Sequence, residues 1–140
     1  MKKILLSLLL VIPFSAVSAQ DMSAERVKDM HSMYVGMGLI QEGFLLNCES
    51  CMQEGIAKVQ SGLKTLTSVD AKVYLPKEQA YAYKFAQKTA RKITLELEYL
   101  KLSLKKGDIQ DAGEAYTNIG MQCLYCHKRI RDWKPKKFNK

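Results

Sequence analysis

Near its C-terminal end the chain contains two cysteines and a histidine in a C-x-x-C-H pattern, formed by Cys123, Cys126 and His127. In a helix, residues three and four apart lie on one face, so these three side chains would share a side. Two thiols can add to the vinyl groups of a haem, and the imidazole can then ligate its iron. The pattern therefore predicts one covalently bound haem c. The alternative, a disulfide between Cys123 and Cys126, leaves His127 without a role.

A second C-x-x-C pair, Cys48 and Cys51, is followed by Met52, where haem attachment would require a histidine. We therefore expect a disulfide between Cys48 and Cys51 and no second haem. A bridge across so short a loop contributes modest stability. A redox-active dithiol is the alternative reading, because a C-x-x-C pair at a helix start can have a lowered thiol pKa.

The elements that must position these residues are helices, because apolar residues recur at three- and four-residue steps and no strand-like alternation competes. The expected helices cover residues 23–47, 56–66, 82–104 and 109 onward through the C-x-x-C-H motif. Gly107 ends the third, Asp108 caps the fourth, and residues 68–79 form the longest connection. Four amphipathic helices in one small domain predict an all-α fold, an antiparallel four-helix bundle with its site between helices.

The first expected helix has an apolar face and three internal glycines. Its apolar face consists of Val27, Met30, Met33, Tyr34, Met37, Ile40 and Phe44. Gly36, Gly38 and Gly43 each cost about 1 kcal/mol relative to alanine inside a helix. Close approach to a flat macrocycle or to the last helix would explain them, as would a kinked or frayed helix end.

The beginning of the chain has the layout of a cleaved secretory signal over residues 1–19, with two lysines, an apolar run and small residues before Gln20. Residues 20–140 then form one domain with a basic C-terminal tail. No other stretch is continuously apolar over the length that a membrane span needs. We therefore expect an exported protein of the bacterial periplasm that does not span the membrane, which suits covalent haem attachment.

The charge of the chain is positive, with 22 lysines and arginines against 14 acidic residues and a formal net charge of +8. Much of the surplus lies in the final segment HKRIRDWKPKKFNK. A basic tail can steer acidic protein partners or anionic surfaces, and it can also be only a solvated terminus. Nucleic acid is not an expected partner for an exported protein.

The chain resembles the class II c-type cytochromes, the cytochrome c prime family, whose haem motif lies close to the C-terminus of a four-helix bundle. The matching residues are Ile119, Gly120, Cys123, Cys126, His127, Ile130 and Arg131. The resemblance implies haem thioethers at Cys123 and Cys126, proximal ligation of the iron by His127, and Arg131 near the haem. An arginine there would raise the reduction potential. Its alternative is a surface charge that belongs to the basic tail.

The sixth iron position decides between two chemistries. By similarity to the low-spin members of the family, Met30 is the expected distal ligand and Met33 the second choice; without either, a side chain such as Tyr34 would cap an open site. His31 is expected on the surface, because it lies about 100° around the helix from Met30. Histidine with methionine suits single-electron transfer, whereas histidine alone suits binding of nitric oxide or carbon monoxide.

We expect an electron carrier and not an enzyme, because no general base, nucleophile or substrate cleft accompanies the motif. Its expected partners are periplasmic redox proteins with acidic docking surfaces, and the resemblance implies pairing of two copies through the first two helices. The rival readings are a helical interaction module stabilised by a four-thiolate zinc site, and a haem-free module closed by disulfides.

Overall fold

The computed structural model describes residues 19–68 and 71–131. The expected signal peptide, except for Ala19, and the end of the basic tail lie outside these ranges. Within them the chain has helices and no β-strand, which confirms the predicted all-α fold. The helices are α1 (Ala19–Leu46), α2 (Glu49–Ser68), α3 (Ala71–Tyr74), the 3-10 helix η1 (Lys77–Ala82), α4 (Tyr83–Lys106) and α5 (Ile109–Ile130).

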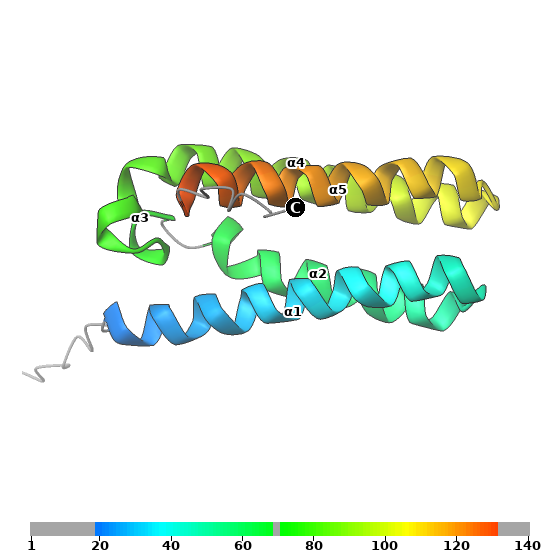
Figure 1. Cartoon of the computed structure of the whole chain (residues 1–140), viewed down its shortest axis with the longest axis horizontal. Helices are drawn as coiled ribbons and strands as arrows, with labels where there is room; N and C mark the ends of the chain where they lie inside the picture. Colours follow the sequence, from blue (N-terminus) through cyan, green and yellow to red (C-terminus); the bar gives the residue numbers. More distant parts are fainter. Residues whose placement is uncertain (1–18, 69–70, 132–140) are drawn as a thin grey trace, which may run out of the picture.

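The four long helices form an elongated bundle made of two hairpins, α1 with α2 and α4 with α5 (Figure 1). The turns that close both hairpins lie at one end of the bundle, whereas α3, the start of α1 and the end of α5 lie at the other. None of the helices in the described ranges is long and apolar enough to cross a membrane.

Both hairpin turns use a residue in the left-handed region to end a helix. Asn47 has φ 53° after α1, and the Cys48 N–H donates to the Gly43 carbonyl oxygen at 3.0 Å. Gly107 has φ 76° after α4, and the Asp108 N–H donates to the Ser103 carbonyl oxygen at 2.9 Å. Asparagine and glycine adopt this conformation with little strain, so each closes a Schellman-type cap.

The predicted cap at the start of α5 is also present. Oδ1 of Asp108 accepts a hydrogen bond from the Asp111 N–H at 3.0 Å, which satisfies a backbone donor that has no partner inside the helix. The local signals around Gly107 and Asp108 therefore fix where α4 ends and α5 begins.

The α1–α2 hairpin is packed closely enough to need glycines. A Cβ atom on Gly36 would lie 2.6 Å from the Gly55 carbonyl oxygen, and one on Gly43 would lie 2.9 Å from the Cys48 carbonyl oxygen. These glycines thus make room for the backbone of α2 and of the turn before it. The sequence had suggested that they make room for a macrocycle or for the last helix, and this expectation was wrong. Gly38 has no such neighbour within 4 Å.

The connection between the hairpins is more ordered than the sequence indicated. Residues 68–79 were expected as a plain connection, but they include α3 and the start of η1, and Tyr74 and Leu75 are buried. Tyr74 and Leu75 pack into the same core as Ile93 of α4, because the connection closes one end of the bundle. A local pattern of alternating polar and apolar residues does not reveal burial of this kind.

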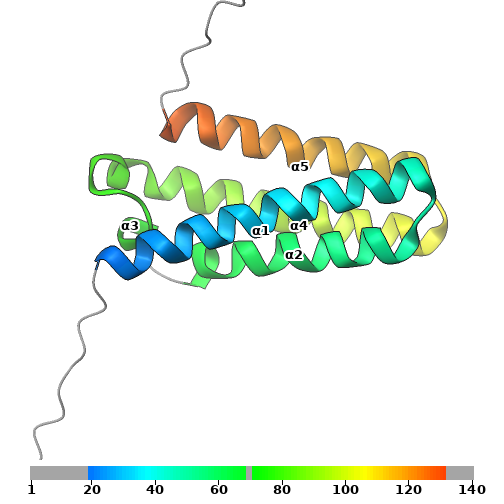
Figure 2. The ribbon, with the colours of Figure 1, turned by 60° about the horizontal axis from the view of Figure 1, so that its bottom comes forward.

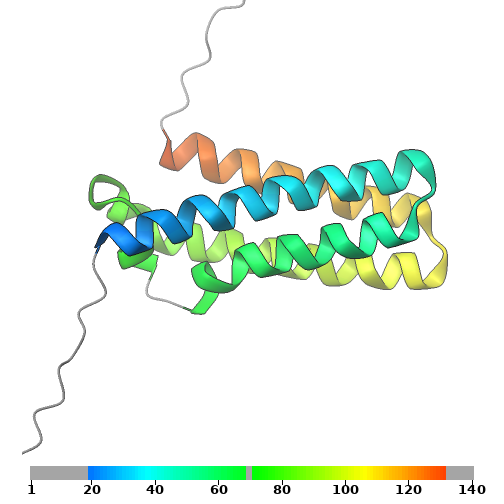
Figure 3. The ribbon, with the colours of Figure 1, turned by 90° about the horizontal axis from the view of Figure 1, so that it is seen from below.

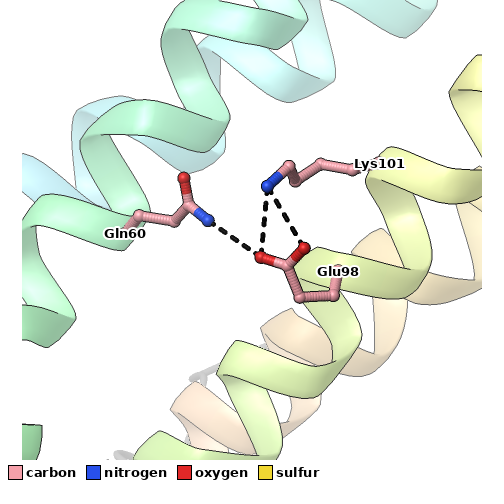
Figure 4. A network of polar contacts seen from close by, with 3 residues as sticks. All are labelled: Gln60, Glu98 and Lys101. Atoms are coloured by element: carbon pink, nitrogen blue, oxygen red, sulfur yellow. Dashed lines mark hydrogen bonds and ion pairs between the residues drawn. The ribbon is translucent and has the colours of Figure 1, made fainter.

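One polar link joins α2 to α4 on the outside of the bundle (Figure 4). The Gln60 side-chain amide donates to Oε1 of Glu98 at 3.1 Å, and the Lys101 ammonium lies 3.1 and 3.2 Å from the two oxygens of Glu98. These groups are exposed to solvent, so the link contributes at most about 1 kcal/mol.

The helices α1 and α5 meet near the hairpin turns and diverge toward the other end of the bundle (Figures 2 and 3). Where they meet, the rings of Phe44 and Tyr116 pack edge to face with centroids 5.8 Å apart. Farther along, no helix of the described ranges covers one side of α1, and Val27 and Tyr34 are 66% and 76% exposed. Val27 lines the space that opens between α1 and α5, as its place on the apolar face predicts, whereas the prediction that Tyr34 belongs to that face was wrong.

Candidate functional site

A cavity of about 370 Å³ lies between the hairpins where α1 and α5 diverge. Apolar side chains from α1, α2 and α4, among them Leu63, Leu66 and Ile93, form much of its wall. The cavity is also lined by the residues that the sequence singled out, namely Met30, Met33, Cys123, Cys126, His127 and Arg131. The fold thus brings together residues that are almost a hundred positions apart in the chain.

The C-x-x-C-H motif lies within α5, in its last two turns. Because Cys123, Cys126 and His127 are three and four positions apart, the helix directs all three toward the cavity. Each of the three is partly buried, and both cysteines are free thiols. The alternative interpretation of this motif was a local disulfide. In the described part of the chain Cys123 and Cys126 are not bonded to each other, so this disulfide is absent.

The environment of the motif favours neutral side chains. Burial raises the pKa of the Cys123 thiol, and burial together with the nearby Cys123 raises the pKa of Cys126 to about 11, although the Arg131 guanidinium opposes the shift. Burial, followed by the positive charge of Arg131, lowers the pKa of His127. Both effects favour the neutral imidazole of His127, which is the form that ligates a metal.

The two candidate methionines of α1 differ in their surroundings. Met30 is partly buried and lines the cavity, packed at the edge of the core. Met33 also lines it, but only 7% of its surface is exposed, and a Cβ atom on Gly62 would lie 2.5 Å from its Cγ. Met33 is thus held within the α1–α2 contact. Tyr34 is exposed and does not line the cavity, so it is not placed to cap it.

Two arginines line the cavity, and only Arg131 was predicted from the sequence. Arg26 of α1 also lines it and donates from Nη1 to the Tyr74 carbonyl oxygen at 2.6 Å and from Nη2 to Oγ of Ser23 at 3.0 Å. The signal that could have found Arg26 is its position one helical turn before Met30, on the same face of α1.

These residues meet the requirements of a covalently bound haem. The volume falls within the range of about 300–1,000 Å³ that is usual for cofactor sites, and the walls are largely apolar. Two thiols and a neutral imidazole come from one helix, and the Met30 thioether comes from another. Arg26 and Arg131 supply positive charge for the two propionates of a haem. The donor set and the cavity therefore fit this group.

The second cysteine pair joins the turn between α1 and α2, which holds Cys48, to the start of α2, which holds Cys51, at the other end of the bundle from the cavity. Cys48 and Cys51 form a disulfide with an S–S distance of 2.00 Å, as predicted. Over residues 19–68 and 71–131, no three His, Cys, Asp or Glu side chains gather in a group that could hold a metal ion. This arrangement gives no support to a zinc site that shares all four thiolates.

A scan against protein-family models, a search of curated proteins and a search of solved structures found no match to this chain.

Proposed function

We propose that the chain is a periplasmic c-type cytochrome that binds one haem covalently and carries single electrons between redox proteins. The observation that carries the proposal is the shared cavity of Cys123, Cys126, His127 and Met30. A disulfide-stabilised interaction module would have no need of an apolar cavity next to two free thiols and a neutral imidazole.

Each part of the cavity has a role in this proposal. Cys123 and Cys126 would hold the haem covalently as thioethers, and His127 of α5 would ligate its iron. Met30 of α1 would offer its thioether to the iron from the opposite helix, and the positive charge of Arg131 would disfavour the more oxidised, more positive state of the group. The apolar residues exclude water from the site, which limits reorganisation when the charge changes. Bound haem supplies an iron that takes up and releases one electron.

The comparison of Met30 with Tyr34 favours electron transfer over gas binding. A saturated iron with histidine and methionine ligands suits outer-sphere electron exchange, whereas nitric oxide or carbon monoxide requires an open position. Met30 lines the cavity, and Tyr34, the side chain that would cap an open site, points elsewhere. We therefore assign the chain to electron carriers and not to enzymes. Pairing of two copies stays a prediction from the resemblance alone.

The test is expression of the full chain in a periplasm that can attach haem, followed by absorption spectra of the ferric and ferrous protein. We expect a red protein that keeps its haem in acidified organic solvent, with a methionine-to-iron charge-transfer band. The double variant Cys123→Ser, Cys126→Ser should lose covalent haem. The double variant Cys48→Ser, Cys51→Ser removes the same number of cysteines and should keep it.

The other outcomes each reject a part of the proposal. A colourless protein would reject the haem, and equal haem loss in both cysteine variants would reject the assignment of Cys123 and Cys126. A high-spin spectrum that shifts when carbon monoxide is added would indicate the five-coordinate alternative in place of an electron carrier.

A further inference from the structure

A second concavity, of about 460 Å³, lies between α4 and α5. We call it the basic groove, and its main lining residues are Phe85, Lys88, Lys92, Tyr125, Lys128 and Arg129. Tyr125 follows Cys123 by two positions, which is about 160° around α5. The groove therefore lies on the side of α5 that faces away from the candidate haem cavity.

The charge of the basic groove is entirely positive. Lys88 and Lys92 come from α4, Lys128 and Arg129 come from α5, and no acidic residue lines the groove. In the described part of the chain, the ion pairs involve other cations, Lys28, Lys58 and Lys101. The four cations of the groove thus concentrate positive charge that the fold itself does not neutralise.

Helix dipoles explain only half of this cluster. Lys128 and Arg129 lie in the last turn of α5, where a cation is favourable for the helix itself. Lys88 and Lys92 lie in the second and third turns of α4, away from the helix end that favours cations. These two lysines therefore have no local structural reason to face the same groove.

Aromatic rings give the groove an apolar component. The Arg129 guanidinium lies over the Phe85 ring, 5.2 Å from its centroid, which is a cation–π distance. Tyr125 is 52% exposed. A surface with cations beside one exposed and one partly buried ring suits a protein face that carries both carboxylates and apolar side chains, since aromatic residues and arginine are enriched in protein interfaces.

The basic groove and the candidate haem cavity share a wall. Thr89 of α4 lines both of them, and neighbouring residues of α5 alternate between the two, with Gln122 on the groove and Cys123 on the cavity. A protein seated in the groove would be separated from the cavity by about the thickness of one helix, roughly 10 Å. This is a suitable position for a partner that exchanges electrons.

We propose that the basic groove is the docking site for the acidic face of a redox protein that exchanges electrons with this chain. This proposal rests on the proposed cytochrome function. In the exchange, one electron passes from the reduced partner to the ferric haem iron, so the partner is oxidised and the iron is reduced by the same single electron. The role of Lys88, Lys92, Lys128 and Arg129 is to bind the partner's carboxylates.

The first measurement uses the haem-loaded full chain and a fluorescently labelled octaglutamate peptide as the probe. Binding is followed by fluorescence anisotropy at low and at physiological salt. The variant Lys88→Gln, Lys92→Gln should weaken binding about fivefold at low salt, and addition of Lys128→Gln and Arg129→Gln should bring the loss to tenfold or more. The affinity for the peptide should also depend less steeply on salt as these charges are removed.

The matched control is Lys105→Gln, Lys106→Gln, which removes the same charge from exposed positions of the same helix outside the groove. It should change the affinity by less than twofold. Both variants retain the basic C-terminal tail, and circular dichroism checks that both fold. Equal weakening in the two variants would overturn the proposal, because net charge alone would then explain binding.

The second measurement is the rate constant for reduction of the haem by an acidic plant-type ferredoxin, with the small reductant dithionite as the reference. The variant Lys88→Gln, Lys92→Gln, called the groove variant, should lose several-fold in rate with ferredoxin and be unchanged with dithionite. Unchanged rates with ferredoxin would overturn the electron-transfer role of the groove. Loss of binding to phosphatidylglycerol vesicles without loss of peptide binding would assign the groove to a membrane surface and would also overturn the proposal.

These outcomes are distinct from failure of the cytochrome function. A colourless protein would reject that function, whereas the same peptide titration made on the haem-free full chain would still report whether the groove binds carboxylates. A red protein with no difference between the groove variant and its control would reject the groove and leave the cytochrome function in place.

Discussion

The hydroxyl of Tyr74 in α3 donates a hydrogen bond to Oδ2 of Asp29 in α1 at 3.1 Å, and both residues are buried. Arg26 reaches the same place through the Tyr74 carbonyl oxygen, at 2.6 Å. Burial raises the pKa of the Tyr74 hydroxyl, and the charge of Asp29 and its hydrogen bond raise it further. This network ties the connection between the hairpins to the edge of the candidate haem cavity.

Tyr74→Phe should lower the free energy of unfolding by about 1–3 kcal/mol at neutral pH, because the buried carboxylate of Asp29 loses its hydrogen-bond donor. The folded state raises the pKa of Tyr74 above its unfolded value of about 10. The stabilisation is therefore complete below pH 10 or so and is lost at higher pH, where the unfolded tyrosine ionises first. Urea unfolding at neutral and alkaline pH measures both effects.

The difference between wild type and Tyr74→Phe should thus become smaller as the pH rises above about 10. Tyr81→Phe is the control, since Tyr81 is exposed, and it should change neither the midpoint nor its pH dependence. A constant difference between wild type and Tyr74→Phe across the alkaline range would contradict the assignment.

Met30→Ala and Met33→Ala should have opposite consequences for spectrum and stability. Met30→Ala should abolish the methionine-to-iron charge-transfer band of the haem-loaded protein, because it removes the proposed axial ligand. Met33→Ala should keep the band and lower the free energy of unfolding by about 2–5 kcal/mol, because Met33 is buried in the α1–α2 contact. Absorption spectra and urea unfolding separate the two, and loss of the band in Met33→Ala alone would reverse the assignment of the ligand.

Gly36→Ala should destabilise the protein, whereas Gly38→Ala, two residues away, should not. A Cβ atom on Gly36 would meet backbone atoms of α2, the Gly55 carbonyl oxygen at 2.6 Å and the Val59 nitrogen at 2.9 Å. Backbone cannot move as a side chain can, so we expect a loss of about 1–3 kcal/mol. Gly38 meets nothing within 4 Å, so alanine there should gain up to about 1 kcal/mol from helix propensity. Thermal unfolding of the two variants measures the contrast, and similar shifts in both would show that the hairpin relaxes.

Removal of the disulfide by Cys48→Ser, Cys51→Ser should cost about 1–2 kcal/mol, because the closed loop is short. Serine at position 48 is also a favourable residue immediately before a helix, which limits the loss. Chemical denaturation under oxidising conditions gives the difference. A loss above about 4 kcal/mol would mean that the bridge does more than close the turn between α1 and α2.

Parts of the fold that depend on neighbouring residues could be predicted from the sequence. The stop at Gly107 and the cap at Asp108 are local, so both are found where the sequence placed them. The C-x-x-C-H motif is likewise a local pattern, and α5 directs Cys123 and His127 into one cavity.

Features that depend on distant residues were missed. The exposure of Tyr34 depends on how α5 diverges from α1, and the spacing of apolar residues along one helix does not carry that information. Tyr74 meets Asp29 across 45 positions. The basic groove joins two lysines of α4 to the end of α5, so the sequence showed only the half that is part of the basic tail.

The division of the bundle into two hairpins also bears on the order in which the chain acquires its structure. Each hairpin closes through a short turn and makes contacts that are close in sequence, so each is expected to form before the two dock. Until docking, the face of α5 with Cys123 and Cys126 has no opposite wall. Under the proposed function, enzymes that attach haem would reach both thiols during this period, and docking of α1 onto the attached group would complete folding.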